Sequence, residues 1–193
     1  MEYINRKGDQ YFIFEGRTKT GKPKYFASRK AASDKGTRLE QLPKRYEIAE
    51  HPSTAVVSIR KIKPTRILDV ELEFVRKKCC RMSGLDSVQV ERRGDQLTIY
   101  APDRDVHAVD SIFSTIFGSA SSGMVDWARQ NMSYTAMLRL TLVDEDNRLF
   151  ASERYCFSGG IDDWIPLSYQ GPLEELAQEL FPTLGDESFY ELM

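Results

Sequence analysis

The chain has 193 residues, 41% of them hydrophobic and 29% charged, with three cysteines and a formal net charge of −2. This length and composition are ordinary for a globular protein of one large or two small domains. No run approaches the roughly 18 apolar residues of a membrane span, and the first residues lack the apolar segment of a signal peptide. An odd number of cysteines, two of them adjacent, excludes a disulfide framework. We therefore expect a cytoplasmic protein with reduced thiols and no membrane partner.

The first 64 residues have the pattern of short strands joined by turns. Runs rich in aromatic and β-branched residues, at 10–16 and 24–28, flank a turn that contains Gly and Pro, which predicts a β-hairpin with a long basic tip. Residues 46–50 and 55–62 predict two further strands. We predict a basic, β-rich unit over residues 1–64, whose apolar content is too small for stability on its own.

The pattern changes after residue 64. Apolar residues recur at helical spacing from Leu68 to Met82, which predicts a helix that ends at Gly84. Two β-hairpins are predicted at 86–102 and 134–157, a loop at 158–167, and further helices at 105–116, 173–181 and 187–192. We predict an acidic α+β domain over residues 65–193. The fold class is then α+β: a small N-terminal antiparallel β unit, followed by an α+β body with two β-hairpins and about four helices.

The small net charge hides an asymmetry along the chain. Residues 1–65 hold 15 Lys and Arg against 7 Asp and Glu, whereas residues 66–193 hold 12 against 22. This distribution predicts a basic surface near the N-terminus and an acidic body after it. The alternative is that the two regions face and neutralise each other.

Three stretches of the chain are similar to stretches of uncharacterised bacterial proteins that have no assigned function: YFIFEGRTKTGKPKYF, YEIAEHP and LFASERYCFSGGIDDWIPL. The resemblance implies a bacterial cytoplasmic protein. It brings no fold, activity or ligand with it.

No residue pattern has the spacing of a metal, cofactor or catalytic motif. Structural zinc sites need four ligands in short paired spacings, whereas Cys79 and Cys80 are adjacent. There is no Gly-x-Gly-x-x-Gly or Walker A pattern, so we predict no metal, no cofactor and no catalytic residue. If the protein is an enzyme, His107 and Asp110 are the candidates, although such a pair is equally typical of an exposed helix face.

The basic hairpin is the strongest candidate for a contact surface. Clustered Lys and Arg bind phosphates and acidic groups, and exposed aromatic rings add base stacking for single-stranded nucleic acids. Trp164, beside two acids in a predicted loop, is a second candidate anchor, or it covers the core. The hairpin tip is alternatively only a solvated, edge-protecting turn. The predicted contact residues are Arg17, Lys19, Lys22, Lys24, Arg29, Lys30 and Trp164, and Arg6, Lys7 and Lys35 would extend the basic patch.

These observations favour a non-enzymatic interaction or adaptor protein, whose basic N-terminal surface contacts a protein partner or a second copy of the chain. The alternative is a nucleic-acid-binding protein that uses the same hairpin. A third hypothesis is an enzyme with a site that is not recognisable from the sequence. A steep loss of affinity with salt would indicate nucleic-acid binding.

Overall fold

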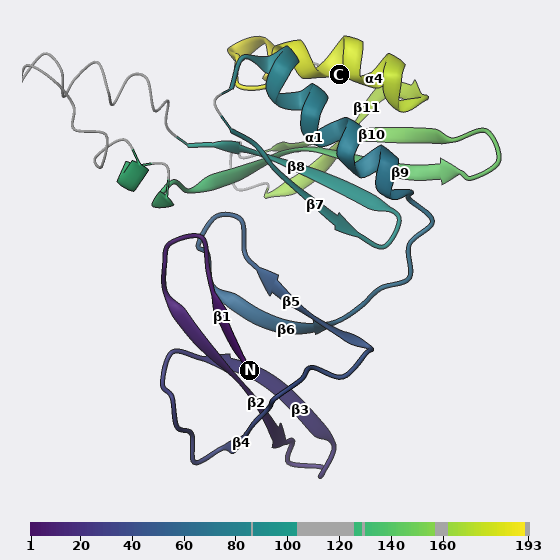
Figure 1. Cartoon of the computed structure of the whole chain (residues 1–193). Helices are drawn as coiled ribbons and strands as arrows, with labels where there is room; N and C mark the ends of the chain where they lie inside the picture. The colour runs from purple at the N-terminus through teal and green to yellow at the C-terminus, as the bar shows by residue number, and fades with distance from the viewer. Residues whose placement is uncertain (86, 104–125, 129, 157–161, 192–193) are drawn as a thin grey trace, which may run out of the picture. The chain divides into compact units, whose positions relative to one another are not determined.

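The structure is a computed structural model in which two compact units are formed (Figure 1). It describes residues 1–85, 87–103, 126–128, 130–156 and 162–191. The first unit contains residues 1–62 together with 126–128 and 130–132, and the other described residues make up the second unit. Of the described residues, 43% lie in strands and 22% in helices.

The first unit is built around β2. Its sheet contains β1 (Glu2–Ile4), β2 (Gln10–Arg17), β3 (Pro23–Ser28) and β4 (Gly36–Arg38). β3 pairs antiparallel with one edge of β2, while β1 and β4 pair one after the other with its opposite edge. A separate hairpin of β5 (Tyr46–Glu50) and β6 (Val57–Lys61) forms a second sheet, and β6 contacts β3.

The core of the first unit is small. Among the described residues of this unit, the buried apolar side chains are Tyr11, Ile13, Phe14, Ala55, Val57 and Met132. Arg6 joins the parts of this unit, because its guanidinium donates to the Glu50 carboxylate at 2.9 Å and to the Met132 carbonyl at 3.2 Å. Hydrogen bonds to a charged group therefore supplement the limited apolar burial.

Two glycines allow β4 to approach β2 closely. Gly16 and Gly36 lie opposite each other, and a Cβ on Gly16 would be 2.4 Å from the Lys35 carbonyl oxygen. A Cβ on Gly36 would be 2.5 Å from the Glu15 carbonyl oxygen. The Phe26 ring lies within 3.2 Å of both Cβ positions, so an aromatic side chain covers the glycines.

The second unit is a five-stranded antiparallel sheet with helices on one face (Figure 1). The strand order is β11-β10-β9-β8-β7. The elements are α1 (Asp69–Ser83), β7 (Gln89–Arg93), β8 (Gln96–Pro102), β9 (Tyr134–Asp144), β10 (Leu149–Cys156), β11 (Asp163–Gly171), α4 (Leu173–Leu180), and two 3-10 turns, η1 (Phe181–Thr183) and η2 (Glu187–Glu191).

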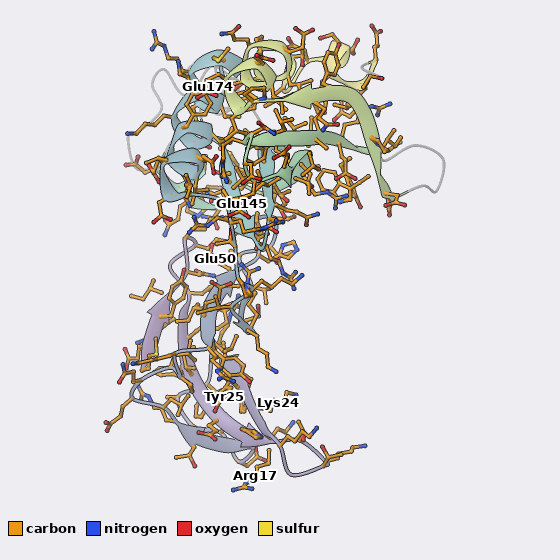
Figure 2. The ribbon with its side chains drawn as sticks, turned by 90° about the vertical axis from the view of Figure 1, so that its right-hand side faces the viewer. Arg17, Lys24, Tyr25, Glu50, Glu145 and Glu174 are labelled. Carbon is orange, nitrogen blue, oxygen red and sulfur yellow. The ribbon has the colours of Figure 1, made fainter. Side chains whose placement is uncertain are left out.

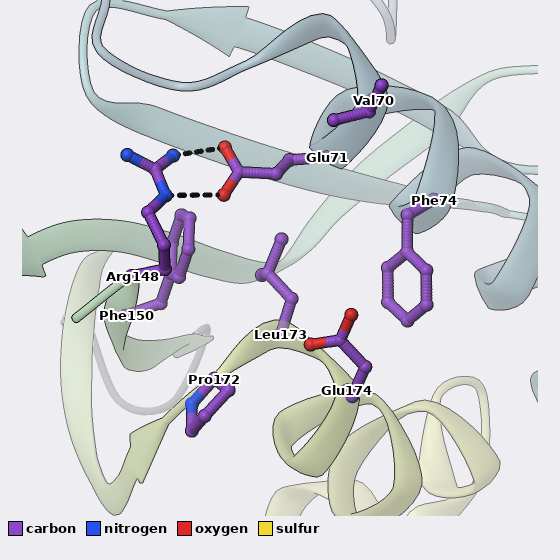
Figure 3. Close-up of a pocket in the computed structure, with 8 residues that line it drawn as sticks. All are labelled: Val70, Glu71, Phe74, Arg148, Phe150, Pro172, Leu173 and Glu174. Carbon is purple, nitrogen blue, oxygen red and sulfur yellow. Dashed lines mark hydrogen bonds and ion pairs between the residues drawn. The ribbon is translucent and has the colours of Figure 1, made fainter. Parts of the chain in front are cut away.

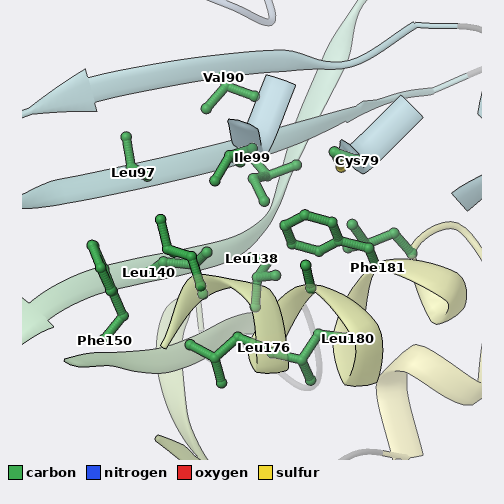
Figure 4. Packing of buried hydrophobic residues seen from close by; sticks show 14 of the residues in the cluster. Cys79, Val90, Leu97, Ile99, Leu138, Leu140, Phe150, Leu176, Leu180 and Phe181 are labelled. Atoms are coloured by element: carbon green, nitrogen blue, oxygen red, sulfur yellow. The ribbon is translucent and has the colours of Figure 1, made fainter. Parts of the chain in front are cut away.

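Strand alternation directs one face of this sheet towards the helices (Figure 4). Leu97 and Ile99 of β8, Leu138 and Leu140 of β9, and Phe150 of β10 are each fully buried. Leu176, Leu180 and Phe181 pack against them from the helical side. Burial of this apolar face is the main contribution to the stability of the second unit.

The helix predicted from Leu68 to Met82 corresponds to α1. It begins after Leu68, whose N–H donates to the Glu71 carboxylate at 2.8 Å, and Gly84 follows it at φ +69°. Both features are typical helix-end signals, since an acid in the first turn and a left-handed glycine satisfy free backbone groups.

The prediction of an α+β fold with about four helices is wrong, because the described structure is mostly β, with three sheets. Three helices are described, of which α1 and α4 have seven or more residues. The predicted terminal helix is the short 3-10 turn η2, and much of the predicted loop at 158–167 belongs to strand β11. β11 contains Pro166, and it is an edge strand, where proline is tolerated. The helix predicted at 105–116 lies outside the described residues.

Candidate contact surface of the first unit

The turn between β2 and β3 is held by its own hydrogen bonds. The Thr18 N–H donates to the Lys22 carbonyl at 2.8 Å, and the Gly21 N–H donates to the Thr18 carbonyl at 2.9 Å. The Thr18 hydroxyl accepts from the Lys22 N–H at 3.1 Å. Gly21 has φ +79°, a conformation that glycine adopts readily. This turn therefore presents its side chains from an ordered backbone.

Five cations gather at this end of the sheet, and we call them the tip surface: Arg17, Lys19, Lys22, Lys24 and Lys35. All five are exposed, and none is ion-paired with a carboxylate in the described part of the chain. Within the described residues, the Arg17 guanidinium donates only to the Gly21 carbonyl, at 3.5 Å. Figure 2 shows Arg17 and Lys24 on the hairpin.

Strand pairing brings Lys35 to the tip surface. Lys24 lies opposite Gly16 on one edge of β2, and Gly36 lies opposite Gly16 on the other. Lys35 directly precedes Gly36. β2 therefore lies between Lys35 and Lys24, which are 11 positions apart in the sequence. The only sequence signal of this proximity is the pair of glycines.

Two tyrosines connect the tip surface to the β5–β6 hairpin. The ring centroids of Tyr25 and Tyr46 are 4.5 Å apart, with the rings edge to face. Burial, and then the negative charge of Glu15, raises the pKa of Tyr25. Tyr46 lies opposite Lys61, a further exposed cation. The sequence did not indicate this contact, because the two tyrosines are 21 positions apart.

The structure separates Arg29 and Lys30 from the other predicted contact residues. Both follow the C-terminal end of β3, whereas the tip surface lies at its N-terminal end. Arg29 pairs with Asp9 at 2.7 Å and donates to the Tyr11 hydroxyl at 3.2 Å. These contacts, with the Tyr11 hydrogen bond first, raise the pKa of Arg29. The positive charge of Arg29 is therefore paired with the carboxylate of Asp9.

Trp164 lies in the second unit, in β11. Its ring lies 4.3 Å from the Arg139 guanidinium and meets the Tyr155 ring edge to face at 5.1 Å. Arg139 in turn forms two hydrogen bonds of 2.6 Å with the Glu153 carboxylate. These contacts form a row of side chains across the sheet, from Arg139 of β9 and Tyr155 and Glu153 of β10 to Trp164 of β11, which lies at its end.

The residues considered for catalysis receive no support from the described structure. His107 and Asp110 lie outside the described residues. In the described part of the chain no three potential ligands are grouped to hold a metal ion. Burial, followed by the neighbouring Cys80, raises the pKa of the Cys79 thiol to about 12, so this sulfur stays protonated and weakly nucleophilic.

Comparisons of the chain with models of protein families, with curated proteins and with solved structures found no match. No helix within the described ranges has the length and apolar character needed to cross a bilayer. The resemblance to uncharacterised bacterial proteins and the cytoplasmic location stay predictions. The tip surface is therefore the basis for inferring a function.

Proposed function

We propose that this protein is a non-enzymatic interaction protein that contacts an acidic protein partner through the tip surface. One observation carries the proposal: five exposed cations, on an ordered turn and on the chain segments beside it, are not ion-paired with any described carboxylate. Complementary charge accelerates association and selects the partner. A turn that is already ordered also loses little conformational entropy on binding.

The positions of the aromatic rings favour a protein over single-stranded nucleic acid. Base stacking needs a free ring face. Phe26 lies over Gly16 and Gly36, and Tyr25 packs against Tyr46. A nucleic acid remains the second candidate, because unpaired cations beside this tyrosine pair also suit phosphate groups.

The test measures binding of fluorescein-labelled polyglutamate, single-stranded DNA, duplex DNA and RNA by fluorescence anisotropy at two salt concentrations. The variant carries Lys19→Glu, Lys22→Glu and Lys24→Glu. The control carries the same charge change elsewhere: Lys30→Glu, Lys77→Glu and Arg81→Glu. We expect salt-sensitive polyglutamate binding that the variant weakens by about tenfold or more and the control leaves within about twofold.

Two results would contradict the proposal. Absence of polyglutamate binding at low salt would show that the tip surface is a solvated turn. The second result is that a nucleic acid binds more tightly than polyglutamate, with a steep salt dependence, and that the tip variant loses this binding whereas the control keeps it. A nucleic acid would then replace the acidic protein as the proposed partner.

A further inference from the structure

A pocket of about 390 Å³ opens in the second unit, where α1, the start of β10 and α4 meet (Figure 3). Its floor is formed by Phe150 and Leu173, which belong to the core. Val70 and Phe74 of α1 and Pro172, which precedes α4, form its apolar walls. This volume lies in the range of known ligand pockets.

The ion pair in this pocket is already satisfied. The Arg148 guanidinium donates to the Glu71 carboxylate at 2.8 Å and through a second, shorter bond, and it also donates to the Arg66 carbonyl at 3.3 Å. Glu71 accepts in addition from the Leu68 N–H. Since both charges have partners within the protein, this pair does not require a ligand.

Glu174 is different, because it is exposed and has no hydrogen bond or ion pair within the described residues. It lies across Leu173 from the Glu71–Arg148 pair (Figure 3). The segment that follows is also acidic, since residues 172–191 contain no Lys or Arg. Its exposed acids are Glu174, Glu175, Glu179, Asp186, Glu187 and Glu191. Of these acids only Glu174 lines the pocket, so the pocket has an apolar floor and one unpaired carboxylate at its edge.

The exposed apolar wall at Val70 supports a ligand with an aliphatic part. Val70 lines the pocket and is 71% exposed. Covering it would remove apolar surface from water, which is favourable.

We infer that this groove binds a basic peptide segment of a partner protein. An aliphatic side chain of the segment packs against Val70, Phe74 and Leu173, and an adjacent Lys or Arg pairs with Glu174. Charge complementarity selects this occupant, because an acidic segment would meet the unpaired carboxylate of Glu174. This inference does not depend on the tip surface, which is proposed to bind an acidic partner.

The experiment uses the full chain and three labelled peptides in anisotropy titrations: Lys-Leu-Lys-Leu-Arg, Lys-Ser-Lys-Ser-Arg and Glu-Leu-Glu-Leu-Glu. We expect the first peptide to bind best, because it alone has both the charge and the aliphatic groups. Val70→Ser and Glu174→Lys should each weaken its binding on the order of fivefold. The control Glu187→Lys makes the same charge change away from the pocket and should leave binding unchanged.

Val70 and Glu174 are exposed, so these variants keep the core intact, and circular dichroism checks their folding. Equal affinity for the first two peptides, or no effect of Val70→Ser, would overturn the inference, since charge alone would then explain binding. No binding of the first peptide would overturn it directly. The tip variant serves as a separate control: it should bind the first peptide as the wild type does, whatever its affinity for polyglutamate.

Discussion

At Gly16 the absence of a side chain is a structural requirement. We predict that Gly16→Ala destabilises the first unit by about 2 kcal/mol, because the new methyl group would meet the Lys35 carbonyl, a backbone atom that cannot move aside without separating β4 from β2. Equilibrium urea unfolding followed by circular dichroism measures this change.

Gly21→Ala is the matched control for this substitution. No described atom lies within 4 Å of a Cβ placed on Gly21, so the left-handed backbone, at φ +79°, is what opposes the change, at a cost of about 1 kcal/mol. Equal losses for the two variants would show that close approach of β2 and β4 does not matter.

Asp95 gives the second unit a pH dependence. Its carboxylate accepts from the Arg66 backbone N–H at 2.8 Å and from the Arg66 Nε at 2.9 Å. The Arg66 side-chain hydrogen bond, followed by the backbone one, lowers the pKa of Asp95 below its ordinary value of 3.8. A lowered pKa in the folded state contributes stability that is present above pH 3.8 and is lost as the pH falls through the folded-state pKa.

We therefore predict that Asp95→Asn destabilises the protein at neutral pH and that the difference from the wild type shrinks as the pH falls below about 4. Urea unfolding at several pH values measures this difference. Glu187→Gln removes an exposed acid that has no hydrogen bond within the described residues, so it should have little effect at any pH. A difference for Asp95→Asn that does not change with pH would contradict the assignment.

Among the elements, β11 depends on contacts of its side chains with β9 and β10. We predict that Trp164→Ala destabilises the second unit by about 2 kcal/mol, because it removes contacts with the Arg139 guanidinium and the Tyr155 ring. Thermal unfolding measures the change. The other tryptophan, Trp127, is 64% exposed, and Trp127→Ala should change stability by less than about 0.5 kcal/mol. Equal effects would mean that the row of side chains across the strands does not stabilise β11.

Elements with strong local patterns were the predictable ones. Alternating residues located β2, β3, β5 and the two hairpins of the second unit, and helical spacing located α1 to within one residue. β11 was missed because Asp162, which precedes it, and Asp163 and Pro166 within it are typical of loops. Its strand conformation depends on pairing with β10, for example Tyr155 opposite Trp164, which local sequence does not indicate.

At the scale of the whole molecule, the two proposed contact surfaces have opposite charge and belong to different units. The tip surface is basic and lies in the first unit, while the groove at Glu174 is acidic and lies in the second. An interaction protein with both surfaces would bind an acidic partner and a basic partner, which is what an adaptor requires.

The sequence by itself determined the charge asymmetry, the main hairpins and α1, because these depend on composition and on residues close together along the chain. Only the tertiary structure decided which cations remain unpaired. Arg29 forms an ion pair with Asp9, whereas Lys35 and Lys24 lie on opposite sides of β2 in the tip surface. Only tertiary packing formed the groove, since α1, β10 and α4 each contribute part of it. The physical reason is the same in each case. Ion pairs and pockets arise between residues that are distant in the sequence, and their proximity depends on strand pairing and core packing.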